Sequence, residues 1–282
     1  MVSLTTAKAP VVVLGGGRYL ARVLVPMLIA RGSRVRVLER RLADLSGVRG
    51  ADREMADPLD EQSLVRGFAG ADVCYDFASE AYGSEVAASV ERAAARVRTT
   101  CLIRVERLEA PLSRPPREGV VVVRAAPVVG AGSPWFVVLR TISDRLPLVP
   151  SPSWMRGESQ PIAVADAGAA LAELVDLALP GQLFDLVGDE RVTYRDLLVR
   201  VGALHGRSVR LMEGGAAGDA AVRLLTRTTL RGEREAMALV SEVAPAPSIA
   251  SERSLLEALG RQPLPLGKAL QAAFSGQRRR IV

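Results

Sequence analysis

The sequence has 282 residues, a mass of 30.0 kDa and a formal net charge of +6. Its hydrophobic content of 49% and charged content of 24% are typical of a globular chain. No apolar run approaches the roughly 18 residues that a membrane span requires. The start of the sequence also lacks the cationic and apolar regions of a signal peptide, so we expect a cytoplasmic protein with no membrane partner.

The basic charge comes almost entirely from arginine, since only Lys8 and Lys268 are lysines. The arginines are scattered along the chain, so we expect no nucleic-acid partner. Cys74 and Cys101 have no second cysteine close in sequence, and His205 is the only histidine. We therefore expect neither a zinc site nor a Ser-His-Asp triad, and no metal.

Short apolar runs alternate with helical patterns over most of the chain. Runs rich in branched or aromatic residues predict strands at residues 11–14, 34–38, 73–77, 100–103, 120–123 and 183–186. Apolar residues at helical spacing predict helices at residues 19–30, 59–68, 84–95, 164–178 and 193–204. This alternation predicts an α/β fold with a doubly wound parallel sheet. Two segments rich in proline and serine, 110–118 and 147–160, are predicted to be irregular.

The first predicted strand leads through GGGRYLA into a helix. Glycines at such a turn let a pyrophosphate approach the backbone N–H groups at the positive end of the helix. Gly15 and Gly17 fit this pattern, and Arg18, Tyr19 and Leu20 follow at the start of the helix. The loop therefore predicts a nucleotide site formed by these five residues.

The second predicted strand ends about 20 residues after the loop, where the adenosine ribose is usually bound. Glu39 can accept a hydrogen bond from a ribose hydroxyl, whereas Arg40 and Arg41 can pair with a 2′-phosphate. Two arginines against one glutamate favour NADPH as the cofactor, with NADH as the alternative.

These features resemble the extended and atypical short-chain dehydrogenases, including their NmrA-like and epimerase-like branches, over nearly the whole chain. The resemblance implies a Rossmann-type NAD(P)-binding domain at residues 1–190 and a smaller C-terminal substrate lobe at 191–282, with the segment 131–160 contributing to the substrate cleft. In the family's G-x-x-G-x-x-G loop, the three glycine positions are here Gly15, Arg18 and Ala21. We expect the Arg18 side chain to lie along the cofactor's phosphates.

Two further segments carry the resemblance into the site. The stretch ADPLDEQSLVRGFAGADVCYDFAS implies that Asp57 meets the adenine edge. It also implies a border to the ribose and nicotinamide formed by Phe77, Ala78 and Ser79. The stretch VVVRAAPVVGAG is similar to a strand and turn whose backbone holds the carboxamide, which here implies Ala126, Pro127 and Val128.

The usual proton donor of the family is absent. Short-chain dehydrogenases typically use a tyrosine whose pKa is lowered by a lysine four residues later. None of the four tyrosines has a lysine at that position. By the resemblance, Arg104 or Val105 also replaces the serine that orients the carbonyl.

Two hypotheses are compatible with this loss. In the first, the chain is an NADPH-dependent ketoreductase, because hydride transfer is the cofactor's own chemistry and needs mainly a held geometry. The proton then comes from Ser79, Tyr82, Arg104, water or an acidic hydroxyl of the substrate. A phenol beside the ketone would serve as such a hydroxyl, so the expected substrate is a hydroxylated aromatic ketone, such as an aromatic polyketide of actinomycete antibiotic biosynthesis.

The aromatic residues of the segment 131–160 bear on this choice. Trp135, Phe136, Trp154 and Met155 are predicted to form an apolar wall above the nicotinamide, suited to a flat substrate. The alternative is that they pack the lobe onto the sheet.

In the second hypothesis the chain is a non-catalytic NmrA-like regulator that binds a dinucleotide and a protein partner. A sugar-nucleotide epimerase is a third possibility, which the missing tyrosine disfavours; the sequence does not indicate an oligomeric state.

Overall fold

The structure is a computed structural model that describes residues 9–146, 148–151, 153–177, 181–215, 217–221, 224 and 248–278. The chain divides into two compact units. Unit 1 consists of Met1–Glu106, Pro111–Arg124 and Gly168–Phe184, and unit 2 consists of Arg107–Ala110, Ala125–Ala167 and Asp185–Val282. Residues 107–110 and 125–167 thus group with the C-terminal residues in unit 2. The predicted cofactor domain 1–190 and substrate lobe 191–282 stay a prediction.

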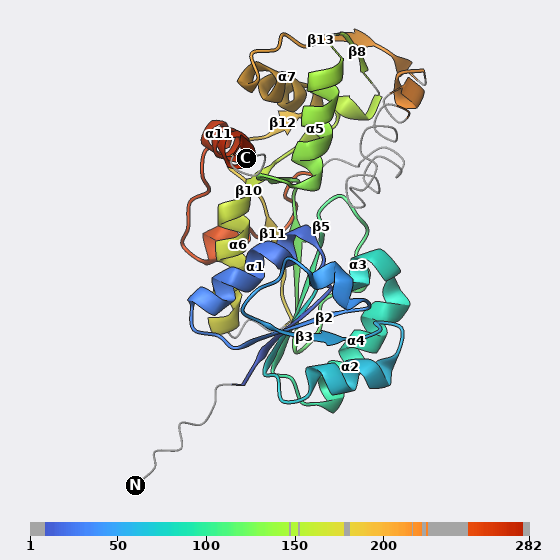
Figure 1. Ribbon diagram of the computed structural model, residues 1–282, viewed down its shortest axis with the longest axis vertical. Helices are drawn as coiled ribbons and strands as arrows, with labels where there is room; N and C mark the ends of the chain where they lie inside the picture. The colour runs from blue at the N-terminus through green and yellow to red at the C-terminus, as the bar shows by residue number, and fades with distance from the viewer. Residues whose placement is uncertain are drawn as a thin grey trace. The chain divides into compact units, whose positions relative to one another are not determined.

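The main sheet has seven strands in the order β11-β6-β5-β4-β1-β2-β3 (Figure 1). β1 pairs in parallel with both β2 and β4, so that Val13 lies opposite Val37 on one side and Tyr75 on the other. The strand order runs outward from β1 in two directions, which confirms the predicted α/β fold with a doubly wound parallel sheet. The strands are β1 (Val11–Leu14), β2 (Val35–Glu39), β3 (Asp52–Met55), β4 (Val73–Asp76), β5 (Cys101–Arg107), β6 (Val120–Ala125) and β11 (Leu183–Leu186).

Helices cover both faces of this sheet in unit 1 (Figure 1). On one face, side chains of β1 such as Val12 and Leu14 belong to a core cluster with Leu64, Phe68 and Val90 of the covering helices. On the other face, the helix that contains Gly168 packs closely against the helix that contains Met27. A Cβ on Gly168 would lie only 2.6 Å from Met27 Sδ. The helices are α1 (Tyr19–Ala30), η1 (Leu42–Leu45), α2 (Glu61–Phe68), α3 (Ser79–Tyr82), α4 (Ser84–Arg96), α6 (Val164–Glu173) and η3 (Leu174–Asp176).

Two strands differ from the predictions. β3 (Asp52–Met55) was not predicted, because all four of its residues are exposed and three of them are charged. β5 was predicted to end at residue 103 but continues to Arg107. Arg104 and Glu106 lie inside this strand and are buried, so the strand continues beyond the point where the apolar run stops.

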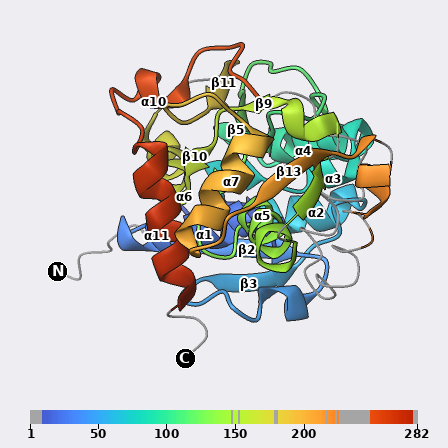
Figure 2. The same cartoon turned by 90° about the horizontal axis from the view of Figure 1, so that it is seen from above.

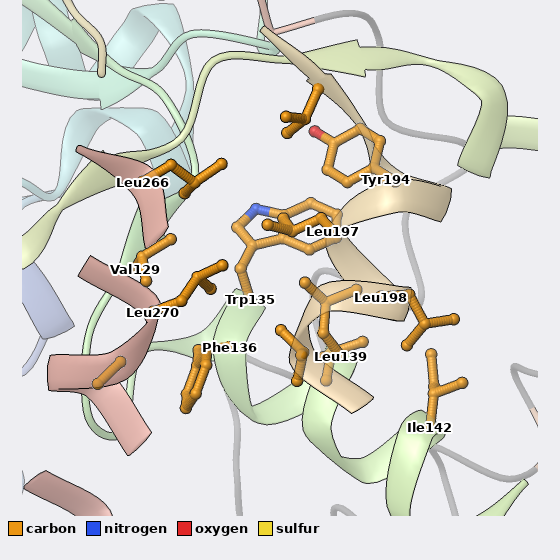
Figure 3. Close-up of a cluster of buried hydrophobic side chains, with 14 of the residues drawn as sticks. Val129, Trp135, Phe136, Leu139, Ile142, Tyr194, Leu197, Leu198, Leu266 and Leu270 are labelled. Atoms are coloured by element: carbon orange, nitrogen blue, oxygen red, sulfur yellow. The ribbon is translucent and has the colours of Figure 1, made fainter. Parts of the chain in front are cut away.

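Unit 2 is built around three helices that lie side by side, α5 (Pro134–Arg145), α7 (Tyr194–Leu204) and α11 (Leu266–Arg278) (Figure 2). Its core contains side chains from all three, including Leu139, Leu198 and Leu270 (Figure 3). Unit 2 also contains the short helices η2 (Ser153–Arg156) and α10 (Leu255–Ala258). Among the described residues, no helix is both long and apolar enough to span a bilayer.

Short strand pairs complete unit 2. β8 (Leu148–Ser151) pairs with β13 (Arg210–Glu213) and β7 (Val128–Val129) with β10 (Ile162–Ala163), both in parallel, and β9 (Glu158–Ser159) pairs antiparallel with β12 (Val192–Thr193). The segment 147–160 is therefore not irregular in its described residues, because β8, η2 and β9 fall within it. The predicted lobe 191–282 includes residues 225–247, which lie outside the described residues.

Both cysteines, Cys74 and Cys101, are free and buried in unit 1. Burial raises the pKa of Cys74 to about 12 and also raises the pKa of Cys101. Because the thiolate is the reactive form of cysteine, we expect neither thiol to react with Ellman's reagent in the folded protein at neutral pH. Absorbance should show both thiols reacting once the chain is unfolded in concentrated urea. Rapid labelling of either thiol before unfolding would contradict this burial.

Candidate functional site

The turn after β1 holds the three-glycine loop tightly against β2. The N–H groups of Gly15 and Gly16 both donate to the carbonyl oxygen of Leu38, at 3.0 and 3.3 Å. Gly15 has a φ of +79°, a conformation that favours glycine. A Cβ on Gly16 would lie only 2.0 Å from Cγ1 of Val37, so this position has no room for a side chain. The loop is therefore a constrained turn of backbone.

The loop ends at the N-terminus of α1. Arg18 is the N-cap residue, but its side chain makes no capping hydrogen bond, and the first turn of α1 holds no acidic residue. Arg18, Tyr19 and Leu20 are half-buried. The first N–H groups of a helix have no partner within it, and the helix dipole adds positive charge there. This end of α1 is therefore suited to bind an anion such as a pyrophosphate.

A carboxylate at the end of β2 is fixed against the loop. Glu39 Oε2 accepts a hydrogen bond from the N–H of Gly17 at 3.0 Å, and Oε1 accepts one from the N–H of Arg40, also at 3.0 Å. A ribose hydroxyl can donate to such a carboxylate, whereas a phosphate at the same place would be repelled by it. Glu39 therefore disfavours a 2′-phosphate at this position, whereas the two arginines beside it are expected to favour one.

Arg40 and Arg41 both lie at the exposed edge after β2 and both have acidic partners. Arg40 Nε lies 3.5 Å from Asp57 Oδ1, and its guanidinium lies over the ring of Tyr82, 5.9 Å from the centroid. The hydrogen bond with Tyr82, followed by the charge of Asp57, raises the pKa of Arg40. Arg41 Nε lies 3.7 Å from Asp44 Oδ2. The structure thus brings together Arg40, Asp57 and Tyr82, three of the predicted site residues.

The segment after β4 lies directly against the loop. Asp76 Oδ1 accepts hydrogen bonds from the N–H groups of Ala78 and Ser79, at 2.9 and 3.0 Å, and Oδ2 accepts one from the Ser79 hydroxyl. A Cβ on Gly15 would lie 3.1 Å from the nitrogen of Ala78. Phe77, Ala78 and Ser79 are all buried. The predicted border residues therefore form one wall of the loop, held by a carboxylate that the sequence pattern does not single out.

Arg104 is fully buried within a cluster of charged side chains in unit 1. Its Nη2 lies 2.6 Å from Glu91 Oε1, and its Nε lies 3.4 Å from Asp76 Oδ2 and 4.0 Å from Glu106 Oε1. Glu91 also pairs with two further arginines, Arg114 at 3.2 Å and Arg117 at 2.8 Å. Burial raises the pKa of Glu106.

This cluster was only partly predictable. The sequence predicts Arg104 as a candidate proton donor, and it does not predict Asp76 or Glu91 as its partners. Their signal is an acidic residue within an apolar pattern, since Asp76 ends the run VCYD and Glu91 lies on the buried face of α4.

The residues predicted to hold the carboxamide, Ala126, Pro127 and Val128, belong to unit 2 and are buried there. The carbonyl oxygen of Pro127 accepts a hydrogen bond from the N–H of Ile162 at 3.1 Å. The carbonyl oxygen of Val128 accepts one from the hydroxyl of Ser133. These two carbonyl groups therefore help to build unit 2, and the contact of the segment with a cofactor stays a prediction.

The four predicted substrate-binding residues all lie in or against the core of unit 2. Figure 3 shows two of them, Trp135 and Phe136. Trp135 stacks on Tyr194 with 5.0 Å between ring centroids, and Trp154 meets the same ring edge-on at 5.7 Å. Phe136 and Met155 have 1% or less of their surface exposed. Packing within unit 2 therefore accounts for their positions, and a contact with substrate stays a prediction.

No protein-family model matches this sequence, and no curated protein matches it. Solved structures match nearly its whole length. A nucleoside-diphosphate-sugar epimerase from Pseudomonas aeruginosa is 19% identical, with a TM-score of 0.70 over 97% of this chain and 99% of its own. An NADPH-dependent quinone oxidoreductase from Escherichia coli, solved with NADPH, is 16% identical, with a TM-score of 0.70 over 94% of this chain and 99% of its own.

A third match is a dTDP-glucose 4,6-dehydratase from Bacillus anthracis, solved with NAD. It is 10% identical, with a TM-score of 0.72 over 96% of this chain and 97% of its own. This chain therefore shares the Rossmann-type α/β fold of these three proteins. At these identities the likeness concerns the fold alone, and membership of the short-chain dehydrogenases stays a prediction.

Proposed function

We propose that this chain is an NADPH-dependent reductase of a ketone on a hydroxylated aromatic small molecule, such as an aromatic polyketide of antibiotic biosynthesis. The observation that carries this proposal is the tight glycine loop leading to the uncapped N-terminus of α1, with Arg40 and Arg41 at the end of the neighbouring strand. The N–H groups of the first turn of α1 would hold the pyrophosphate. The two arginines would pair with the 2′-phosphate of the adenosine ribose.

Two of the matching structures support a nicotinamide dinucleotide as the cofactor, since one was solved with NADPH and another with NAD. The quinone oxidoreductase among them also supports reduction of a flat conjugated carbonyl compound. When bound, the cofactor supplies the hydride. The chain itself would hold the cofactor through the glycine loop, Asp57 and residues 77–79. It would also hold the substrate carbonyl close to the nicotinamide.

Two of the candidate proton donors, Ser79 and Arg104, are already engaged, which supports the substrate or water as the proton source. The Ser79 hydroxyl donates to Asp76, and Arg104 is enclosed by three carboxylates. A phenol beside the ketone already donates to the oxygen on which negative charge develops. It can offset part of the roughly 10² to 10⁴-fold contribution of a general acid.

The test compares matched substrates with the purified chain. Loss of NADPH absorbance is followed with an aromatic ketone that has a neighbouring phenol, and with its methyl ether as the control. We expect reduction of the phenolic ketone and a rate at least about 10²-fold lower for the ether. Dinucleotide binding with no reduction of any phenolic ketone would contradict the proposal.

The cofactor preference has its own prediction. Replacing Arg40 and Arg41 together by alanine should weaken NADPH binding about 10 to 100-fold, because a hydrogen bond to a charged group contributes about 1.5–3 kcal/mol. NADH binding should change less than about twofold, since NADH has no 2′-phosphate. Isothermal calorimetry measures both. The control is Arg66→Ala, which removes an exposed arginine of α2 that pairs with Asp60 at 4.0 Å. An equal loss for both coenzymes would contradict a 2′-phosphate contact.

The missing tyrosine and lysine favour a second function, that of a non-catalytic regulator that binds the dinucleotide. Such a protein needs the loop and the edge after β2 but no proton donor. It would bind NADPH without oxidising it and form a stable complex with a protein partner. The matched ketone assay, together with calorimetry, separates the two functions.

A further inference from the structure

We infer that Arg104 and Asp76 form a positioning pair that sets the shape of the dinucleotide loop, an inference that rests on the proposed function. The two residues lie opposite each other in neighbouring strands, since Asp76 of β4 is in register with Arg104 of β5. Both are completely buried. A buried ion pair is costly to form, so this pair is expected to serve the segment that it holds.

Asp76 works as an acceptor on every side. Its two oxygens receive the N–H groups of Ala78 and Ser79, the hydroxyl of Ser79 and the guanidinium of Arg104. All four partners are donors, so both carboxyl oxygens of Asp76 are used as acceptors. One of these donors is the Arg104 guanidinium, which also places a positive charge beside the buried carboxyl group. Arg104 thus helps to hold Asp76 in the orientation that the turn requires.

Arg104 is itself held on its other side. Glu91 of α4 binds its Nη2 at 2.6 Å, and Glu106 lies 4.0 Å from its Nε. With Arg114 and Arg117 on Glu91, the cluster contains three arginines and three carboxyl groups. The pair is therefore anchored at both ends, on a helix and on two strands.

The turn held by Asp76 transmits this position to the loop. The carbonyl carbon of Phe77 and the nitrogen of Ala78 would each lie 3.1 Å from a Cβ on Gly15, so the turn already touches the loop backbone. The N–H of Phe77 also donates to the carbonyl oxygen of Leu14, at 3.0 Å. If Asp76 rotates, the 77–79 wall and Gly15 must move with it. Arg104 therefore acts on the loop through Asp76 and does not touch the ligand.

The test is Asp76→Asn, measured as the affinity of the full chain for NADPH and for NADH by calorimetry. The amide places a donor among four donors, so the turn must shift. We expect both affinities to fall about tenfold and by the same factor, because a change of loop shape does not involve the 2′-phosphate.

The matched control is Glu91→Gln, which makes the same chemical change on a second carboxylate partner of Arg104, one that among the described residues bonds arginines and not the 77–79 turn. It should lower the urea midpoint, as Asp76→Asn does, and change both affinities less than about twofold. A role in stability alone would give both variants the same small change in affinity. That result would overturn the inference.

If Asp76→Asn does not fold, Arg104→Lys replaces it. Lysine keeps the positive charge, but its single ammonium group cannot bind Asp76 and Glu91 together as the planar guanidinium does. The affinities for NADPH and NADH should therefore still fall by one common factor. Unchanged affinities in Arg104→Lys would overturn the inference and leave the proposed function standing. Failure of the wild-type chain to bind either coenzyme would instead overturn the proposed function.

Discussion

Arg104→Met should lower the free energy of unfolding by about 3–5 kcal/mol, the cost of removing one partner from a buried ion pair. Methionine has a similar length but no charge, so Asp76, Glu91 and Glu106 would lose their shared cation. Glu91 would keep Arg114 and Arg117, whereas Asp76 would be left among neutral donors. Urea unfolding followed by circular dichroism measures the change as a shift in the midpoint.

The control for this result is Arg34→Met, which removes an exposed arginine that pairs with Asp52 at 3.0 Å. An exposed pair contributes about 0–1 kcal/mol, so the midpoint should move little. If Arg104→Met shifts the midpoint no more than Arg34→Met does, the cluster is not a buried ionic one. The double variant Arg104→Met/Asp76→Asn would then show no coupling between the two sites either.

Gly16→Ala should destabilise the fold by about 1–3 kcal/mol, because a side chain would be forced into an already filled space. The added methyl would lie 2.0 Å from Val37 Cγ1 and 3.0 Å from Leu45 Cδ2. The loop must then move away from β2, so we also expect dinucleotide affinity to fall. Gly47→Ala is the control, since a Cβ at Gly47 meets no atom within 4 Å.

A second substitution tests the cause of this effect. Val37→Ala removes the methyl group that a side chain at residue 16 would meet first. The double variant Gly16→Ala/Val37→Ala should therefore lose less stability than the sum of its two single variants, with a coupling of about 0.5–3 kcal/mol. Strict additivity in urea unfolding would show that the crowding at β2 is not what makes Gly16 necessary.

The sequence predicts best the elements whose apolar pattern is unbroken. The bounds of α1 (Tyr19–Ala30), β1 (Val11–Leu14) and β11 (Leu183–Leu186) agree with those predicted, since each is a run or stripe of apolar residues with a clear end. β3 and the second half of β5 lack such a pattern. Their charged residues pair with residues from other elements, and a contact of this kind leaves no periodic signal in the sequence.

The candidate site shows the same limit. The glycine loop and the residues Glu39, Arg40 and Arg41 could be predicted, because they are close in sequence to a strand end with a known use. The bond from Gly17 to Glu39 joins residues 22 positions apart, and the pair of Asp76 and Arg104 joins residues 28 positions apart. Such pairs depend on which strands become neighbours. Similarly, the sequence predicts Trp135 and Trp154 either as a wall above the nicotinamide or as packing residues, and only the fold shows that both rings contact Tyr194.

The exposed strand β3 affects how copies of this chain behave when crowded together. A bare sheet edge offers unpaired backbone groups to any other extended chain. Along β3, however, Asp52 pairs at 3.0 Å with Arg34, which directly precedes β2, and Glu54 pairs at 3.1 Å with Arg36 of β2. An incoming strand would have to strip water from these charges before it could bond to the backbone. The charged residues that prevent the prediction of β3 from an apolar pattern therefore also protect this sheet edge from pairing with a strand of another chain.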